Sequence, residues 1–244
     1  MQKNSIISTA LVVLILLAGA LFWAFQRGVV FVKDGSLGFS KSAITNPIPN
    51  IVREPVFPEG FPEDAKDSYR KNIDTLADTL EADPLNFASW LDLAIYYRMV
   101  NDHEGAVAVW EYLRNLYPQD ALSVHNLAEY YFHTAKDYLK AEKYYEESIQ
   151  KNLTLESNYT DMYEMYRYVY KQDTNAAVEI LQRGAQNIGG KTATQFKIMI
   201  GRHYRDVLND KDNARKYLTE ARDQAQKAGD RSIANELTRE ISAL

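Results

Sequence analysis

Cysteine is absent from this chain of 244 residues. Without a thiol there is no disulfide, no thiolate metal site and no cysteine nucleophile. An excess of positive charge is missing too, because 28 Lys and Arg residues stand against 33 Asp and Glu residues and leave a net charge of −5. We therefore expect no nucleic-acid partner. Apolar residues make up 46% of the chain, which is enough to build a packed core.

Signatures of catalysis are missing as well. The sequence holds no H-E-x-x-H, G-x-S-x-G, G-x-x-x-x-G-K-[ST] or G-x-G-x-x-G motif. Carboxylates such as Glu142, Glu146 and Glu147 have the spacing of a solvated helix face rather than of a catalytic cleft. We therefore predict that the protein is not an enzyme, and we predict no catalytic residue, no cofactor and no metal ion.

One long stretch lacks charge altogether. Residues 6–25 are uncharged and mostly apolar, and they follow a short tail, residues 1–5. About 20 apolar residues at 1.5 Å each cross a hydrocarbon core of about 30 Å, so this stretch predicts a transmembrane anchor. Trp23 lies near one end, as in an aromatic belt. A cleaved signal peptide is the alternative, since residues 18–20 (Ala-Gly-Ala) resemble a cleavage site.

The orientation of this anchor follows from two opposed signals. Lys3 precedes the apolar run, whereas Arg27, Lys33 and Lys41 follow it, and this count of basic residues favours a cytoplasmic C-terminal part. A very short tail before an apolar run is instead typical of a signal-anchor, which leaves the bulk of the chain outside. We interpret the protein as a single-pass membrane protein with its C-terminal part outside the cytoplasm.

Residues 26–63 are rich in proline. Five prolines between Pro47 and Pro62 fix φ and remove backbone donors, so this part predicts an extended stalk rather than a helix. Residues 28–45 contain two short β-like runs around a Lys-Asp-Gly-Ser turn, which would allow a small hairpin. Phe57 is a candidate to dock on the domain that follows.

Two short amphipathic helices are predicted between Trp90 and Pro118, with a tight polar turn between them. The spacing follows the pattern W-x2-L-G-x2-Y, A-x3-F and P of the tetratricopeptide repeat, except that Ala94 replaces the usual glycine and Trp110 replaces the usual phenylalanine. In both cases the replacement stays in the same size class as the usual residue, small for Ala94 and large aromatic for Trp110. This stretch therefore resembles a tetratricopeptide repeat.

Degenerate copies of this pattern follow. The alanines that open the second helices lie 35, 36 and 37 residues apart, just above the usual repeat length, and they are Ala106, Ala141, Ala177 and Ala214. We expect the extra residues to sit in turns such as 134–137 and 208–212. The resemblance predicts an all-α solenoid with a half-repeat at 64–84, four tetratricopeptide repeats at 87–228 and a capping helix at 230–244.

The wording of the turns, Asp102-His-Glu-Gly-Ala106 and Asp137-Tyr-Leu-Lys-Ala141, also resembles that of membrane-anchored bacterial repeat proteins of no assigned activity. This resemblance implies that the apolar anchor lies in a bacterial cytoplasmic membrane, with the repeat domain outside the cytoplasm.

One group of residues that includes two histidines is a candidate metal site. His125, Glu129 and His133 lie four residues apart on one helix face, and zinc accepts such ligands. The two imidazoles are about 12 Å apart along the axis at 1.5 Å per residue, which is too far for one ion. We therefore interpret these side chains as the polar lining of a groove.

In the tetratricopeptide family the first helix of each pair lines a concave groove that takes a peptide or a helix. By alignment to the family, the groove residues would be Leu91, Ile95, Arg98, Met99, His125, Glu129, Phe132, His133, Thr160, Glu164, Arg167, Ile198, Arg202 and Arg205. This set suggests an apolar floor at one end and a positive stretch at the other, where three arginines either bind an acidic peptide or are simply solvated.

The resemblance implies a non-catalytic, membrane-anchored scaffold that binds a protein or peptide through its groove. A structural subunit of an envelope or secretion assembly, acting by self-association as a homo-oligomer, is the alternative. An enzyme or an enzyme's regulatory subunit is a third reading. The sequence does not identify the partner.

Overall fold

The computed structural model describes residues 30–33, 36–39, 50–172 and 174–244. The expected tail 1–5 and the expected anchor 6–25 lie outside these residues. Within the described part of the chain, no helix has the length and apolar character needed to cross a membrane. The chain divides into two compact units, residues 1–106 and 107–244, which are described separately here.

The first unit contains a two-stranded hairpin within the segment 28–45. Strands β1 (Val30–Lys33) and β2 (Ser36–Phe39) pair antiparallel, with Val30 opposite Phe39 and Lys33 opposite Ser36. The β-branched and aromatic residues Val30, Phe31 and Val32 have a high strand propensity.

Helices α2 (Glu63–Ala82) and α3 (Phe87–Met99) pack together in the first unit, and α4 (His103–Leu116) begins there. Helix α2 starts directly after Pro62, and α3 is capped by Asn86, whose side chain accepts a hydrogen bond from the Ser89 amide at 3.0 Å. The buried face of α3 holds the residues of the repeat pattern: Trp90, Leu93, Ala94 and Tyr97.

The C-terminal part of the expected stalk is packed on this unit rather than free. Phe61 lies 5.6 Å from Tyr69 of α2 between ring centroids, and Tyr69 lies 5.9 Å from Tyr96 of α3. Tyr97 receives a hydrogen bond from the Arg53 amide at 2.9 Å. Residues 51–61 therefore belong to the folded unit.

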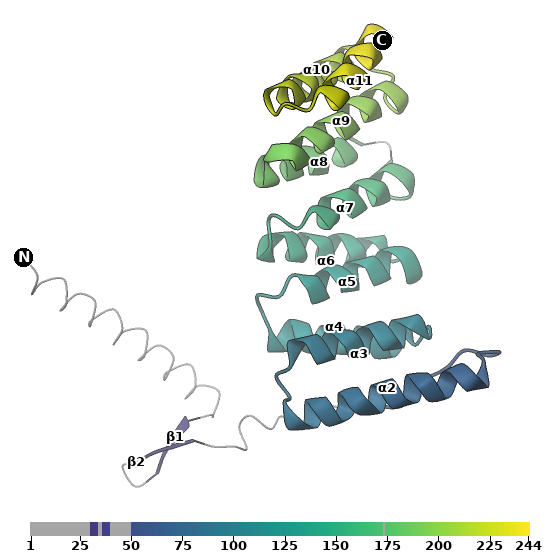
Figure 1. Ribbon diagram of the computed structural model, residues 1–244, viewed down its shortest axis with the longest axis vertical. Coiled ribbons are helices and arrows are strands. Elements are labelled where there is room, and N and C mark those ends of the chain that lie inside the picture. The colour runs from purple at the N-terminus through teal and green to yellow at the C-terminus, as the bar shows by residue number, and fades with distance from the viewer. Residues whose placement is uncertain (1–29, 34–35, 40–49, 173) are drawn as a thin grey trace, which may run out of the picture. The chain divides into compact units, whose positions relative to one another are not determined.

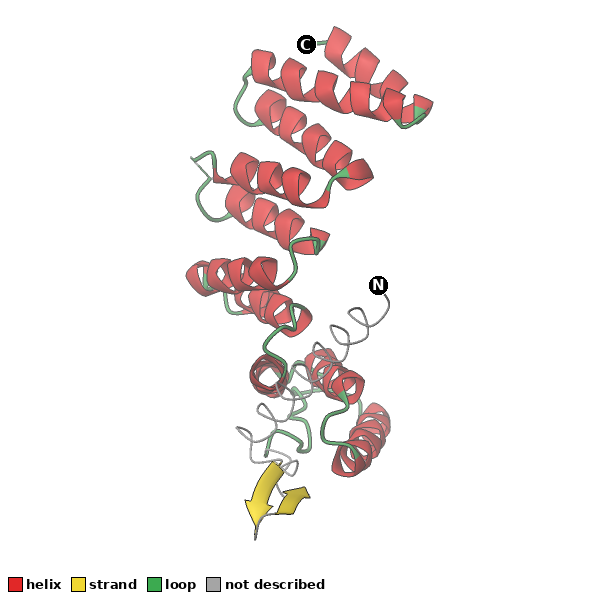
Figure 2. Cartoon of the chain, turned by 90° about the vertical axis from the view of Figure 1, so that its left-hand side faces the viewer, coloured by secondary structure: helices red, strands yellow, loops and turns green. Residues whose placement is uncertain are grey.

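The second unit is itself a succession of helices, arranged in chain order along it (Figure 1) and joined by short loops (Figure 2). Its elements after α4 are α5 (Leu122–Glu129), η2 (Tyr130–Thr134), α6 (Tyr138–Lys151), α7 (Glu156–Tyr168), α8 (Ala176–Ile188), α9 (Gly190–Asp206), α10 (Lys211–Lys227) and α11 (Arg231–Ser242). Each helix from α5 onward packs on the next, because one apolar face alone cannot be buried.

These helices form two layers. The first layer consists of α5, α7, α9 and α11, joined in turn by contacts His125–Asn158, Tyr163–His203 and Arg202–Glu240. The second layer consists of α4, α6, α8 and α10, joined by contacts Arg114–Glu147, Glu146–Arg183 and Gln182–Tyr217. This alternation of layers is the arrangement that the repeat pattern predicts, so the fold is an α-solenoid of tetratricopeptide-like helix pairs.

Four of the reversals between helices share one local design. A residue with positive φ is followed by an aspartate that caps the next helix, and an alanine stands four residues after that aspartate. In each case the aspartate side chain accepts a hydrogen bond from the amide three residues ahead. The pairs of positive-φ residue and capping aspartate are Asn101–Asp102, Lys136–Asp137, Asn209–Asp210 and Gly229–Asp230.

The extra residue of the second repeat lies inside a helix, not only in the turn where the sequence placed it. Helix α5 runs directly into η2, a π-helical turn in which the Ala135 amide donates to the Tyr130 carbonyl at 3.0 Å. A π turn holds one more residue than an α turn, so it absorbs an insertion while the helix axis continues. Sequence periodicity alone does not reveal such a turn.

Candidate functional site

The outward face of α3 carries an apolar stripe. Leu91, Ile95 and Met99 lie four residues apart on this face; Ile95 is 41% exposed and Met99 is 57% exposed. The opposite face of α3 is buried in the core of its unit. A helix that is apolar on all sides is normally covered on all sides, so this stripe has the character of a contact surface. Arg98, also exposed, lies beside it.

A chain of buried polar groups links α5 to α7 through α6. The Ser148 hydroxyl donates to the Ala121 carbonyl at 2.8 Å and accepts from the Asn158 amide nitrogen at 2.9 Å. The Asn158 amide oxygen lies 2.9 Å from Nδ1 of His125. An amide oxygen only accepts hydrogen bonds, so this network places a proton on Nδ1 and fixes the ring orientation.

Carboxylates gather at the other ring nitrogen of His125. Its Nε2 lies 3.7 Å from Oδ2 of Asp161. One ring nitrogen of His125 and one carboxylate oxygen each of Glu129 and Asp161 all lie within 4.8 Å of one another. Burial raises the pKa of Asp161 to about 6; the charge of His125 opposes this rise, and the charges of Glu129 and Glu164 add to it. The cluster therefore collects negative charge in a half-buried place.

The hydroxyl of Tyr145 belongs to the same place. Its side chain is fully buried, and its ring centroid lies 5.8 Å from that of His125. Within the described residues this hydroxyl has no hydrogen-bond partner. Burial raises the pKa of Tyr145, and the charges of Asp161, Glu129 and Glu164 raise it further.

Some of the groove residues expected from the sequence lie together in the structure, and others lie apart. His125, Glu129 and Glu164 share the cluster, and Thr160 lies next to Asp161 on α7. His133 is exposed in η2 and is not part of the cluster. Asp161 was not expected there; it directly follows Thr160, the residue of the next repeat that the alignment matches with His125.

Phe132 and Ile198 are corrections to the expected groove lining. Both are buried: Phe132 joins the core around α6, and Ile198 packs with Leu218 and Leu237 of α10 and α11. In a helix with 3.6 residues per turn, a shift by a single residue in the alignment of a degenerate repeat turns a side chain by about 100°, which is enough to move it from the groove to the interior.

The arginines of α9 have carboxylate partners on α11. Arg202 donates to Glu236 at 2.7 Å and to Glu240 at 3.0 Å, and Arg205 also donates to Glu240. The side chain of Arg205, followed by the charges of Arg167 and Arg202, lowers the pKa of Asp206, so the three arginines share one region. The carboxylates of Glu236, Glu240 and Asp206 largely balance the charges of Arg202 and Arg205.

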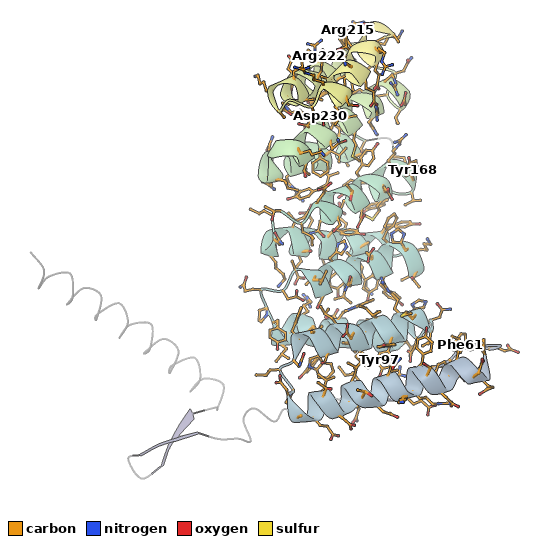
Figure 3. The ribbon with its side chains drawn as sticks, viewed as in Figure 1. Phe61, Tyr97, Tyr168, Arg215, Arg222 and Asp230 are labelled. Carbon is orange, nitrogen blue, oxygen red and sulfur yellow. The ribbon has the colours of Figure 1, made fainter. Side chains whose placement is uncertain are left out.

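Arg167 ends this region on α7. Its guanidinium donates to the Tyr163 hydroxyl at 2.8 Å and lies 4.8 Å from the ring centroid of Tyr168, which is exposed at the end of α7 (Figure 3). Stacking of this kind orients the guanidinium without neutralising it. Among the three arginines expected in the groove, Arg167 thus differs from Arg202 and Arg205, which the capping helix engages.

Comparison with known proteins bears on the fold. No protein-family model matches the sequence, and no curated protein matches it. Among solved structures, the crystal structure of MamA is similar, with a TM-score of 0.50 and 20% sequence identity over 68% of this chain and 94% of that chain. At this identity the likeness concerns the fold alone. It agrees with the helix pairing described above and supports a tetratricopeptide-like fold.

Proposed function

We propose that this protein is a non-catalytic, membrane-anchored scaffold that binds an amphipathic helix of a partner protein. The uncharged run at residues 6–25 supports the proposal of a membrane anchor. We propose that this anchor lies in a bacterial cytoplasmic membrane, with the repeats outside the cytoplasm. A tetratricopeptide-like fold supports protein binding in general, because such folds offer extended surfaces rather than enclosed cavities.

The observation that carries the proposal is the two-sided apolar character of α3. Its inner face holds the core residues of the first unit, so the outer residues Leu91, Ile95 and Met99 are not needed for that core. Exposed apolar area of this kind is costly in water unless a partner covers it. The spacing of four residues matches the ridge that a second helix packs against.

The chemistry of the partner follows from this surface. A methionine and two branched aliphatic side chains form an adaptable apolar surface, on which an amphipathic helix can place residues at i, i+3, i+4 and i+7. Arg98, at the edge of the stripe, favours an acidic residue at the border of the partner's apolar face.

Site-specific photo-crosslinking in the native cells tests the proposal. A photoreactive phenylalanine analogue replaces Met99 in the full-length chain, and Leu139 serves as the matched control because it is 71% exposed and lies outside the groove residues. We expect a covalent adduct with another protein from position 99 and none from position 139. Ile95→Glu in the same chain should remove that adduct, because a charge then faces the partner's apolar side.

The outcomes separate this function from its alternative. An adduct of twice the mass of the chain would favour a structural subunit that self-associates. The absence of any adduct at position 99, or one that survives Ile95→Glu, would refute binding at α3. Protease treatment of intact spheroplasts, followed by detection of residues 64–244, tests the placement outside the cytoplasm: we expect digestion, and protection would refute this placement.

A further inference from the structure

We propose that His125, Glu129 and Asp161 bind a divalent transition-metal ion between α5 and α7. This inference is independent of the proposed partner surface on α3, since it concerns only residues of the second unit. It also differs from the groups weighed on sequence alone, because Asp161 of the next repeat takes the place that His133 cannot reach.

The distances suit such an ion. Zinc binds imidazole nitrogen and carboxylate oxygen at about 2.0–2.2 Å, so two ligands at a tetrahedral ion lie about 3.4 Å apart. Nε2 of His125 and Oδ2 of Asp161 are already 3.7 Å apart. All three donor atoms lie within 4.8 Å of one another, and the half-exposed Glu129 side chain can close the remaining gap by rotation about its own bonds.

The imidazole is held in the state that a metal requires. The hydrogen-bond chain from the Ala121 carbonyl through Ser148 and Asn158 reaches Nδ1 of His125, which therefore carries the proton. In the neutral ring the lone pair is then on Nε2, which points toward the carboxylates. Metal-binding histidines usually have such a partner at the other nitrogen, where it orients the ring. The side chain of His125 is only 9% exposed.

A second, independent observation is the hydroxyl of Tyr145. It is buried without a hydrogen-bond partner among the described residues, and the ring that carries it lies 5.8 Å from the ring of His125 between centroids. A buried hydroxyl without a partner costs free energy. With three protein ligands, a metal ion keeps a fourth position for water, and this water can donate a hydrogen bond to Tyr145 or to Glu164.

The helix geometry at Glu129 also suits a site. Helix α5 ends at this residue and η2 begins at the next one, so the backbone changes from α to π winding immediately after the ligand. Single π turns in helices frequently occur at functional sites, because they rotate the side chains that precede and follow them. Here the π turn also rotates His133 away from the line of His125 and Glu129.

The ligand set selects the class of metal. Imidazole suits zinc and other first-row transition metals, whereas calcium and magnesium prefer oxygen ligands. Two carboxylates beside one imidazole form a mixed oxygen and nitrogen ligand set, which suits a divalent transition-metal ion. Zinc is the appropriate probe for affinity, and cobalt is the appropriate probe for coordination geometry because its visible absorption depends on the ligands.

Calorimetric titration of the chelator-treated full chain in detergent with zinc chloride tests the proposal. We expect one ion per chain. Asp161→Asn and Glu129→Gln should each weaken binding at least tenfold, since each removes an anionic ligand while keeping its shape. His133→Gln, which changes an exposed imidazole eight residues away on the same helical segment, should bind zinc as the natural chain does. Excess calcium should not displace the zinc.

Circular dichroism of each variant separates loss of metal binding from loss of fold. Asp161→Asn should keep the helical spectrum, because it removes a half-buried charge rather than a packed group. Cobalt should give a visible absorption band in the natural chain and in His133→Gln, and none in Asp161→Asn. No zinc binding by the natural chain, equal binding by a folded Asp161→Asn, equal loss in His133→Gln, or displacement by calcium would each overturn the proposal.

Discussion

Arg53 donates two hydrogen bonds to the carboxylate of Asp102, from Nη1 at 2.6 Å and from Nη2 at 2.9 Å. The same carboxylate accepts from the Val56 amide at 2.7 Å and from the Gly105 amide at 2.9 Å. Its side chain is 2% exposed. One aspartate thus caps α4 and holds the proline-rich segment against the first repeat, so the segment and the repeat are coupled in stability.

Replacing Arg53 tests this coupling. Arg53→Ala leaves the Asp102 charge buried with amide partners only, and we expect it to lower the free energy of unfolding by about 2 kcal/mol. That is less than the loss for a fully buried pair, since Arg53 is 34% exposed. Urea unfolding of the full chain in detergent measures the change. Arg70→Ala, which removes a solvent-exposed pair with Glu54, is the matched control and should change little. Equal effects of the two variants would contradict the coupling.

The acid stability of the first unit should depend on Asp102. Burial by itself raises the pKa of this carboxyl, but hydrogen bonds from Arg53, Val56 and Gly105 outweigh burial and lower the pKa. The folded state therefore binds fewer protons than the unfolded chain. This contribution is present above the unfolded pKa of about 3.9 and is lost as pH falls through the lower folded value.

Limited proteolysis between residues 50 and 62 measures this loss, because the segment becomes cleavable when it leaves the repeat. An acid-active protease such as pepsin should cut the natural chain there faster as pH falls below about 4, relative to its cleavage of an unstructured peptide. The Arg53→Ala chain should already be cut at pH 5. A rate ratio between the two chains that does not change with pH would contradict the assignment.

The repeat pattern predicted the fold because it depends on which residues are buried, and burial has a period. Trp90, Leu93, Ala94 and Tyr97 were predicted to share one face, and all four are in the core. The docking of the proline-rich segment was harder to predict. Arg53 and Asp102 lie 49 residues apart, and an aspartate at a helix start is fully explained by capping alone.

The candidate metal site could be predicted only in part. His125 and Glu129 are neighbours on one helix, so their spacing reveals them. Asp161 joins them from the next repeat, and that requires the register between two repeats of unequal length. The same uncertainty in register placed Ile198 in the groove, whereas it packs with Leu237 of the capping helix. Contacts between repeats are therefore harder to predict from the sequence than contacts within one repeat.

Gly184→Ala is expected to destabilise the protein, although alanine has a higher helix propensity than glycine. An alanine in an exposed helix position is more stable than glycine by about 0.5–1 kcal/mol. In α8, however, a Cβ at this position would lie 2.5 Å from Phe196 and 2.9 Å from Tyr159. We therefore expect Gly184→Ala to destabilise the chain by about 1–3 kcal/mol, measured by urea unfolding.

Phe196→Leu provides the control for this close approach. Removal of the ring should make Gly184→Ala less costly than in the natural background, with a coupling of about 0.5–3 kcal/mol between the two positions. Additive effects of the two substitutions, or a stabilising Gly184→Ala, would show that α8 and α9 are further apart than described.

His203 should make the second unit sensitive to mild acid. Burial lowers the pKa of this imidazole, and the charge of Arg167 lowers it further. The side chain lies against Tyr163, with ring centroids 5.7 Å apart, and its Nδ1 has no hydrogen-bond partner among the described residues. The unfolded chain therefore takes up a proton near pH 6.5 that the folded chain does not, so stability falls as pH decreases below this value.

His203→Phe tests this origin, because phenylalanine keeps the ring against Tyr163 and cannot be protonated. Urea midpoints at pH 7.5 and pH 5.5 should differ less in this variant than in the natural chain. His133→Phe, which removes an imidazole at an exposed position, is the matched control and should retain the natural difference. If the two urea midpoints differ as much in His203→Phe as in the natural chain, His203 is not the origin of the acid sensitivity. Other groups then take up the proton on unfolding.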